Sequence, residues 1–269
     1  MAGKPLLGAP TEYPQRYAPE LLVAIPRAGG REGLGAVCFN GVDIWTAYEL
    51  SWLDARGKPR VAIGEFTVPC DSPAIVESKS FKLYLNSFNQ ERLAGEDDLV
   101  DTLRRDLGAA LGALPDIELF TVDGYAARGI QRFEGVCIDE LDIDCVTFEP
   151  RTDYLATAPG SARESESLYS HLLKTNCPVT GQPDWASIAI RYRGATIDRE
   201  GLLRYLVSFR QHQDFHEHCV ERIFSDILRC CNPEELDVYA RYTRRGGLDI
   251  NPFRSTRARR PAMVRTARQ

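Results

Sequence analysis

The 269-residue sequence lacks several features that mark common functional classes. No apolar run approaches the roughly 20 residues that a membrane-spanning helix needs. Residues 1–19 hold no apolar stretch of the kind found in secretory signal peptides. The net charge of −5 differs from that of a protein built to coat nucleic acid. We therefore expect a cytoplasmic protein that binds neither a membrane nor nucleic acid directly.

The cysteines show no metal-binding spacing. There is no CxxC pair, so a zinc ribbon is not expected. In a chain of this length without a secretory signal, we expect reduced thiols rather than a disulfide framework. The eight positions are Cys38, Cys70, Cys137, Cys145, Cys177, Cys219, Cys230 and Cys231.

A dinucleotide-binding fingerprint is also absent. Several glycines lie together near residue 30, but the pattern predicts neither a strand before them nor a helix after them. We interpret them as part of a flexible loop in an extended arm, residues 1–35. These glycines are Gly29, Gly30, Gly33 and Gly35.

The remaining pattern predicts an α+β fold in which one order of elements occurs twice. Alternating and helical apolar periodicities indicate strands, then two helices, then strands, in each half of the chain. The predicted elements of the first half are 43–53, 60–68, 77–88, 98–107 and 117–122. Those of the second half are 185–192, 198–211, 215–230 and 236–242.

The repetition extends to individual residues. Residues 84–90 match residues 205–211 at an offset of 121, with five identities in seven positions. We infer two copies of a strand-strand-helix-helix-strand-strand unit, with antiparallel sheets that carry paired helices on one face. The predicted domains are an arm (1–35), a first module (36–128), a connection (129–162), a second module (163–252) and a basic tail (253–269). Exposed sheet edges invite pairing, so we expect a homo-oligomer, at least a dimer.

Cys177 is the centre of the most informative stretch. It precedes Pro178, so the thiol is expected on a turn rather than in a helix. Asp184 follows in a loop just before a strand, and a loop thiol beside a loop carboxyl is a plausible reactive pair. The same residues also fit a small buried apolar side chain and an ordinary turn carboxylate.

Three of the four histidines lie within residues 212–219. A metal site here would use His216, His218 and Cys219, with Cys177 as a further ligand. However, His216 and His218 would point roughly 200° apart on a helix, which opposes joint ligation. The alternatives are polar groups that face a pocket, with His216 and Glu217 at the helix start, or a solvated helix N-terminus.

The third cluster is the basic turn 244–247. Two guanidinium groups followed by Gly246 and Gly247 suit a phosphate, and Lys79 and Lys82 could add charge. A solvated basic turn is the alternative. The arginines of the C-terminal tail are expected on a mobile, solvated segment; they are Arg254, Arg257, Arg259, Arg260, Arg265 and Arg268.

Together these stretches resemble the QueF family, the 7-cyano-7-deazaguanine reductases of queuosine biosynthesis. The matching pieces are residues 77–84, 177–184, 215–217 and 244–252. The chain looks like the long form, in which the signature lies in the first module and the nucleophile in the second. The resemblance implies two tandem modules of the tunnelling fold (T-fold), which the family shares with GTP cyclohydrolase I.

The resemblance also implies an activity: NADPH-dependent reduction of the nitrile of 7-cyano-7-deazaguanine to a primary amine, 7-aminomethyl-7-deazaguanine, for tRNA modification. Two NADPH are used per turnover as co-substrate, and no metal is expected. Cys177 would form a covalent thioimide, with Asp184 as proton donor and His216 as proton relay. The implied substrate contacts are Glu77, Ser78, Phe215, His216 and Glu217. The implied NADPH contacts are Ser78, Lys79, Arg245 and Gly246.

Two other functions stay open. A zinc-dependent cyclohydrolase of the same fold would need converging Cys and His ligands and would ignore NADPH. A non-catalytic module that binds a purine or tRNA would form no covalent adduct, and the acidic charge weighs against tRNA.

Overall fold

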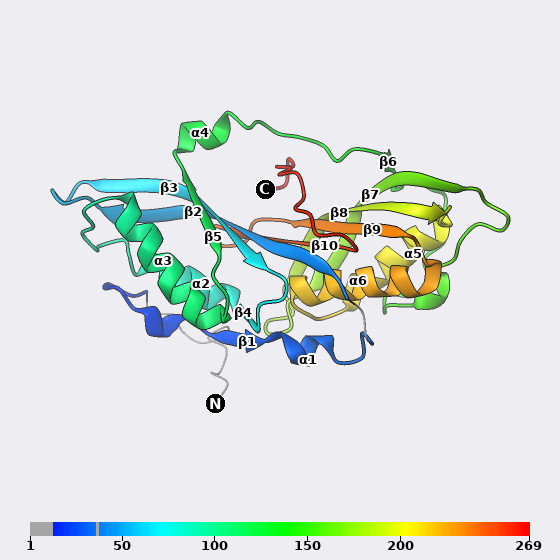
Figure 1. The fold of residues 1–269 in the computed structure, drawn as a ribbon, viewed down its shortest axis with the longest axis horizontal. Helices are drawn as coiled ribbons and strands as arrows, with labels where there is room; N and C mark the ends of the chain where they lie inside the picture. Colours follow the sequence, from blue (N-terminus) through cyan, green and yellow to red (C-terminus); the bar gives the residue numbers. More distant parts are fainter. Residues whose placement is uncertain (1–12, 36–37) are drawn as a thin grey trace. The chain divides into compact units, whose positions relative to one another are not determined.

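The computed structural model describes residues 13–35 and 38–269 (Figure 1). The chain divides into two compact units, each built from segments far apart in the sequence. The first unit contains the described residues up to Gly29, together with Asp43–Gly129 and Arg244–Ile250. The second contains Gly30–Val42 as far as it is described, Ile130–Thr243 and Asn251–Gln269. Among the described residues, no helix is both long and apolar enough to cross a bilayer.

The strands of the first unit form an antiparallel sheet. Strand β3 (Pro59–Pro69) pairs with β5 (Asp116–Phe120) on one side and is hydrogen-bonded to β2 (Asn40–Leu53) on the other. The β3 register runs from Ile63 opposite Phe120 to Thr67 opposite Asp116. A separate two-stranded antiparallel sheet joins β1 (Ala24–Pro26) and β4 (Ala74–Val76). Strands β2 and β3 follow each other in the chain and are neighbours in the sheet, which confirms the hairpin predicted around residue 58.

Two helices cover the sheet of the first unit, α2 (Ser78–Asn86) and α3 (Glu96–Leu111). In α3 the buried leucines recur every fourth residue, which puts them on one face of the helix. The ring of Phe81 on α2 lies 5.2 Å from that of Trp45 on β2 and 5.1 Å from that of Phe66 on β3. Burying these aromatic and leucine side chains stabilises the packing of the helices on the sheet. A short helix, α4 (Val122–Ala126), follows β5.

The second unit repeats this arrangement. Strands β7 (Arg163–Asn176), β8 (Pro183–Ala195), β9 (Glu235–Tyr242) and β10 (Leu248–Ser255) are antiparallel neighbours in the order β7-β8-β9-β10. A two-residue strand, β6 (Val136–Cys137), pairs with β7 in parallel. Helices α5 (Arg199–Ser208) and α6 (His216–Cys231) are separated by a 3₁₀ turn, η3 (Phe209–Gln211). Apolar side chains of both helices and of β8 and β9 form one core.

The sequence repeat corresponds to a repeated hydrogen bond. In the first unit, the Tyr84 hydroxyl donates to Asp106 Oδ2 at 2.7 Å. In the second unit, the Tyr205 hydroxyl donates to Asp226 Oδ2, also at 2.7 Å. Each pair ties the first helix of its unit to the second, so the matched residues do the same structural work in both halves.

The mixed α+β class with antiparallel sheets is confirmed, but two local predictions are wrong. The loop predicted around Gly29 and Gly30 is a short helix, α1 (Arg27–Arg31). A side chain at position 30 would meet the ring of His218 at 2.0 Å, so glycine is needed there for packing rather than for flexibility. The prediction of a solvated C-terminal tail is wrong at Arg254. This side chain is 0% exposed near the end of β10, and its guanidinium pairs with Glu221 at 2.7 Å.

Candidate functional site

Cys177 lies at the turn of the β7–β8 hairpin. Its N–H donates to the carbonyl of Gln182 at 2.9 Å, and Asp184 lies opposite Thr175 in the register. Residues opposite each other, and residues two apart, point to the same face of an antiparallel pair. Cys177 and Asp184 are therefore diagonal neighbours on one face, a relation that typically places Cα atoms roughly 7–8 Å apart. Both are buried, at 4% and 6% exposure.

The loop before α6 is hydrogen-bonded to the residue that precedes the cysteine. The N–H of Asn176 donates to the carbonyl of His212 at 2.8 Å, and the N–H of Asp214 donates to the carbonyl of Asn176 at 3.2 Å. Because α6 begins two residues later, at His216, these bonds place the N-terminus of α6 next to the hairpin turn. Side chains from the turn and from the first turn of the helix are thereby brought together.

His216 connects the helix to the hairpin. Its Nε2 lies 3.3 Å from Asp184 Oδ2. The imidazole stacks in parallel on the ring of Tyr242, with centroids 3.6 Å apart and planes 2° apart. Burial, together with the charges of Cys219 and Asp184 among others, raises the pKa of Tyr242 well above its usual value, so this stacking partner stays a neutral phenol. The stack fixes the plane of the imidazole and so keeps Nε2 directed at the carboxylate.

A second acid–imidazole pair holds the helix start. His218 Nδ1 lies 3.1 Å from Asp214 Oδ1, four residues earlier. Burial would raise the pKa of Asp214, but the neighbouring imidazoles of His212 and His218 outweigh it and hold this pKa well below its usual range. Burial alone would lower the pKa of His218, and the hydrogen bond and charge of Asp214 raise it instead. This pair was not anticipated, because it depends on the burial of His218 and the partial burial of Asp214.

Two further predicted substrate contacts, Phe215 and Glu217, lie in the same stretch. Glu217 is the second residue of α6 and is 1% exposed. The orphan N–H groups and the positive end of the dipole at a helix N-terminus favour a carboxylate there. Phe215 is the N-cap residue, and its ring makes an edge-on contact with His218 at 5.8 Å. The structure thus brings together Cys177, Asp184 and all three predicted residues 215–217.

Glu77 has a structural role that the sequence did not reveal. It is the N-cap of α2, 1% exposed, and its two carboxylate oxygens accept hydrogen bonds from the N–H groups of Lys79 (2.9 Å) and Ser80 (2.7 Å). Asp, Asn, Ser and Thr are the usual capping residues, so a glutamate in this position gave no signal of its own. Ser78 is the first residue of the helix, and both it and Lys79 are partly exposed.

The basic turn lies beside the same helix, within the first unit. A side chain at Gly246 would meet Lys82 Nζ at 3.3 Å, and Lys82 pairs with Glu49 at 3.3 Å. Gly246 has a φ of 61°, the left-handed region that glycine adopts most readily. The guanidinium of Arg244 lies 4.8 Å from the centre of the Tyr48 ring. Lys82 and the turn 244–247, which are far apart in the sequence, therefore lie side by side, and the carboxylate of Glu49 lies next to both.

Among the described residues, nothing supports a metal site in the histidine cluster at residues 212–219. Its members, His216, His218 and Cys219, do not form a group with converging ligand atoms. Such a group does occur elsewhere, at Cys137, Asp139 and His171. The sequence gave no signal for it, because Cys137 and Asp139, at and just after β6, are separated from His171 on β7 by a long connection.

The fold and these contacts define a class: mixed α+β proteins that hold a buried thiol near a carboxylate–imidazole pair, the kind of group used in covalent catalysis. Two family models match the chain. Residues 13–119 match the N-terminal part of the nitrile reductase, 7-cyano-7-deazaguanine-reductase, and residues 183–261 match the QueF-like protein model.

Curated relatives match nearly the whole chain. The NADPH-dependent 7-cyano-7-deazaguanine reductase of Bordetella bronchiseptica is 60% identical over 267 residues, which is 98% of this chain and 97% of the relative. The protein of the same name from Dechloromonas aromatica is 58% identical over 254 residues, 93% of this chain and 89% of the relative. The chain belongs to this family of nitrile reductases.

Proposed function

We propose that this protein uses NADPH to reduce the nitrile of 7-cyano-7-deazaguanine to a primary amine, through a covalent thioimide on Cys177. The product, 7-aminomethyl-7-deazaguanine, would serve queuosine formation in tRNA. The observation that supports this most strongly is the Asp184–His216 pair at 3.3 Å, on the face of the hairpin that carries Cys177.

The thiol and the acid act on the two ends of the nitrile. The Cys177 thiolate bonds to the nitrile carbon, and one C≡N π pair moves to nitrogen. Asp184 gives that nitrogen a proton, which leaves a C=N bond. His216, held by Tyr242, can return a proton to Asp184 from its position at 3.3 Å. Burial of Cys177 and Asp184 keeps water from the imine that follows loss of the thiolate.

NADPH supplies hydride when bound, two per turnover because a nitrile and a primary amine differ by four electrons. The residues that we assign to it are Ser78, Lys79, Arg245 and Gly246. The patch formed by the turn 244–247 and Lys82 suits its phosphates, since cationic side chains lie beside a glycine turn. This mode of binding would not need the dinucleotide fingerprint that the sequence lacks.

Substrate recognition is assigned chiefly to Glu217. A fixed carboxylate can accept two N–H bonds from the amidine edge of a guanine-like base, and such a site rejects bases that lack those donors. Glu77 uses both oxygens to cap α2, so we infer that it acts on the substrate mainly by fixing the helix start and Ser78. Phe215 and His216 complete the assigned contacts.

We further propose that the chain is two tandem T-fold modules, residues 36–128 and 163–252, with an arm, a connection and a basic tail. The matched Tyr84–Asp106 and Tyr205–Asp226 bonds support the duplication. A homodimer is the assembly we favour, because β5 is a terminal strand of its sheet and could pair with a second copy. All eight cysteines are outside any disulfide, in keeping with a cytoplasmic location.

Intact-mass spectrometry with 7-cyano-7-deazaguanine, without NADPH, tests the proposal. The wild type should gain the mass of one base, located on the peptide that contains Cys177. Cys177→Ala should form no adduct and should lose NADPH oxidation, whereas Cys145→Ser, which changes an exposed cysteine, should behave as wild type. Normal NADPH oxidation by folded Cys177→Ala would refute the covalent route.

A further inference from the structure

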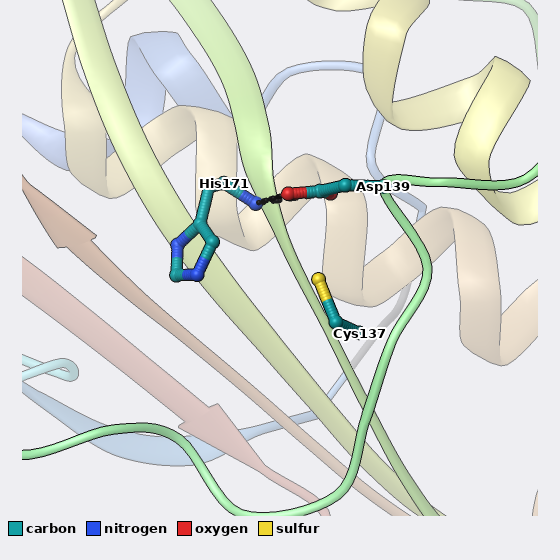
Figure 2. A group of neighbouring side chains, drawn as sticks. All are labelled: Cys137, Asp139 and His171. Carbon is teal, nitrogen blue, oxygen red and sulfur yellow. Dashed lines mark hydrogen bonds between the residues drawn. The ribbon is translucent and has the colours of Figure 1, made fainter.

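A cluster outside the proposed reaction site brings together three side chains that metals bind. Cys137 ends β6, Asp139 follows it closely, and His171 lies on β7 (Figure 2). One ligand atom from each lies within 4.8 Å of the other two. All three belong to the second unit, and none is assigned a part in nitrile reduction.

The strand pairing explains why Cys137 and Asp139 face the same way. Cys137 lies opposite Tyr169 in the parallel pair, and the N–H of Ile138 donates to the carbonyl of Tyr169 at 3.0 Å. Ile138 is 1% exposed and belongs to the apolar core. Residues on either side of an inward-facing strand residue point outward together. The core thus anchors Ile138 and presents the two ligand side chains at the surface.

Asp139 is held in position by β7. Its carboxylate accepts a hydrogen bond from the Ser170 hydroxyl at 2.6 Å and from the N–H of His171 at 3.0 Å. These donors lie where the β7–β8 register shifts, between Ser170 and Leu173. A bulge of this kind re-aims side chains, and here it brings His171 to the same side as Asp139.

His171 is oriented by a buried hydroxyl. Its Nδ1 lies 2.7 Å from Ser187 Oγ, and Ser187 is 1% exposed. The ring also contacts that of Tyr169, with centroids 5.4 Å apart. Fixing Nδ1 in a hydrogen bond leaves Nε2 as the ligand atom, which is the usual outer-shell arrangement of a metal-binding histidine.

We propose that Cys137, Asp139 and His171 bind Zn²⁺. A thiolate with an imidazole and a carboxylate selects zinc over the hard cations Mg²⁺ and Ca²⁺, which prefer oxygen ligands. Bonds of about 2.0–2.3 Å at tetrahedral angles place ligand atoms roughly 3.5 Å apart. The cluster must therefore contract by about 1 Å, and Cys137, which is exposed, can move by rotation of its side chain. Three protein ligands leave the fourth position to water.

Zinc here would fasten the short strand β6 to β7. The strand has two residues, and most of the chain between it and β7 is irregular. A bond network across β6 and β7 would hold this connection against the sheet, and the site would act on the fold rather than on the nitrile.

Metal binding to the full-length protein, freed of metal by a chelator, tests the site. Zn²⁺ should bind with one equivalent in competition with a chromophoric chelator, and Co²⁺ should give a thiolate-to-metal absorption band. Cys137→Ser should abolish the band, and His171→Gln should weaken binding by about 100-fold or more, while Ser187→Ala, which removes the orienting hydroxyl, should weaken it about 10- to 100-fold.

Cys145→Ser is the matched control, because it removes another exposed cysteine of the same connection and should bind like the wild type. The proposal is overturned if the wild type takes up no stoichiometric zinc. It is equally overturned if Cys137→Ser and His171→Gln, folded by circular dichroism, bind zinc as tightly as Cys145→Ser.

Discussion

The role of proton donor that we propose for Asp184 can be tested by replacing a single atom. In Asp184→Asn the amide cannot give a proton, but Cys177 and the hairpin stay in place. We expect the variant to form the covalent adduct with the cyano base, while NADPH oxidation falls by about 10²- to 10⁴-fold, the usual contribution of a general acid. Stopped reactions analysed by intact mass and by absorbance would measure both. A rate equal to wild type would rule out the acid role.

Local sequence was enough to find the thiol and the carboxyl, because the β7–β8 hairpin holds both. Pro178 forces a turn after Cys177, and the hairpin then places Asp184 diagonally across from it on the same face. The sequence could not show the partner of His216. Tyr242 comes from β9, and its stacking depends on how β9 lies beside β8. The capping bonds of Glu77 were missed for a different reason, since glutamate is not a usual capping residue.

At the scale of an element, the start of α6 should make stability depend on pH. The pKa of His218 is raised from 6.5, so the Asp214–His218 pair contributes fully below that pH and less as pH rises through the folded pKa. The pKa of Asp214 is lowered from 3.8, so the contribution is present above that pH and is lost as pH falls through its folded pKa. The stabilising window therefore runs from about pH 4 to about pH 6.5.

Comparison of the wild type with His218→Gln measures this window. The difference in free energy of unfolding between the two proteins should be larger at pH 5.5 than at pH 8.5, as followed by denaturant titration. His216 is unchanged in this variant, so a loss of activity is not part of the expectation. A difference that grows as pH rises would contradict the ion pair.

The helix pairs of the two units allow a matched comparison. Tyr205→Phe removes the hydroxyl that bonds to buried Asp226 and should cost about 1.5–3 kcal/mol of stability. Tyr84→Phe should cost less, because Oδ2 of Asp106 keeps a hydrogen bond from the Tyr17 hydroxyl at 2.5 Å, whereas the hydrogen bond that Asp226 keeps, from Arg229, is to its other oxygen, Oδ1. Thermal or denaturant unfolding would give both values. A larger cost for Tyr84→Phe would contradict this account of the two helix pairs.

At the scale of the whole molecule, the two units are not consecutive halves of the chain. Residues 244–250 belong to the first unit, although 114 residues of the second, Ile130–Thr243, precede them. Periodicity predicted the order of the helices and strands, because that order is local. Periodicity could not predict which unit contains each end of the chain. That depends on which distant strands pair, and tertiary packing decides this pairing rather than local sequence.

Truncation after residue 243 should therefore damage both units. It removes residues 244–250 from the first and residues 251–269 from the second, including buried Arg254 and its pair with Glu221. Glu221 would keep its pair with the partly exposed Arg31 but would lose the fully buried Arg254, which destabilises the second unit. We expect the truncated chain to lack cooperative unfolding by circular dichroism and calorimetry. A truncated protein that unfolds with the wild-type midpoint would show that these segments contribute nothing.

The 4% exposure of Cys177 has a practical meaning for anyone who handles the protein. Small alkylating agents and peroxide should reach the surface sulfurs Cys38, Cys137 and Cys145 well before it. On the proposed covalent route, a preparation whose outer thiols are already lost should remain active, so a count of titratable thiols would say little about the fraction of working enzyme. Only a reagent that reaches the buried thiol of Cys177 reports on that sulfur.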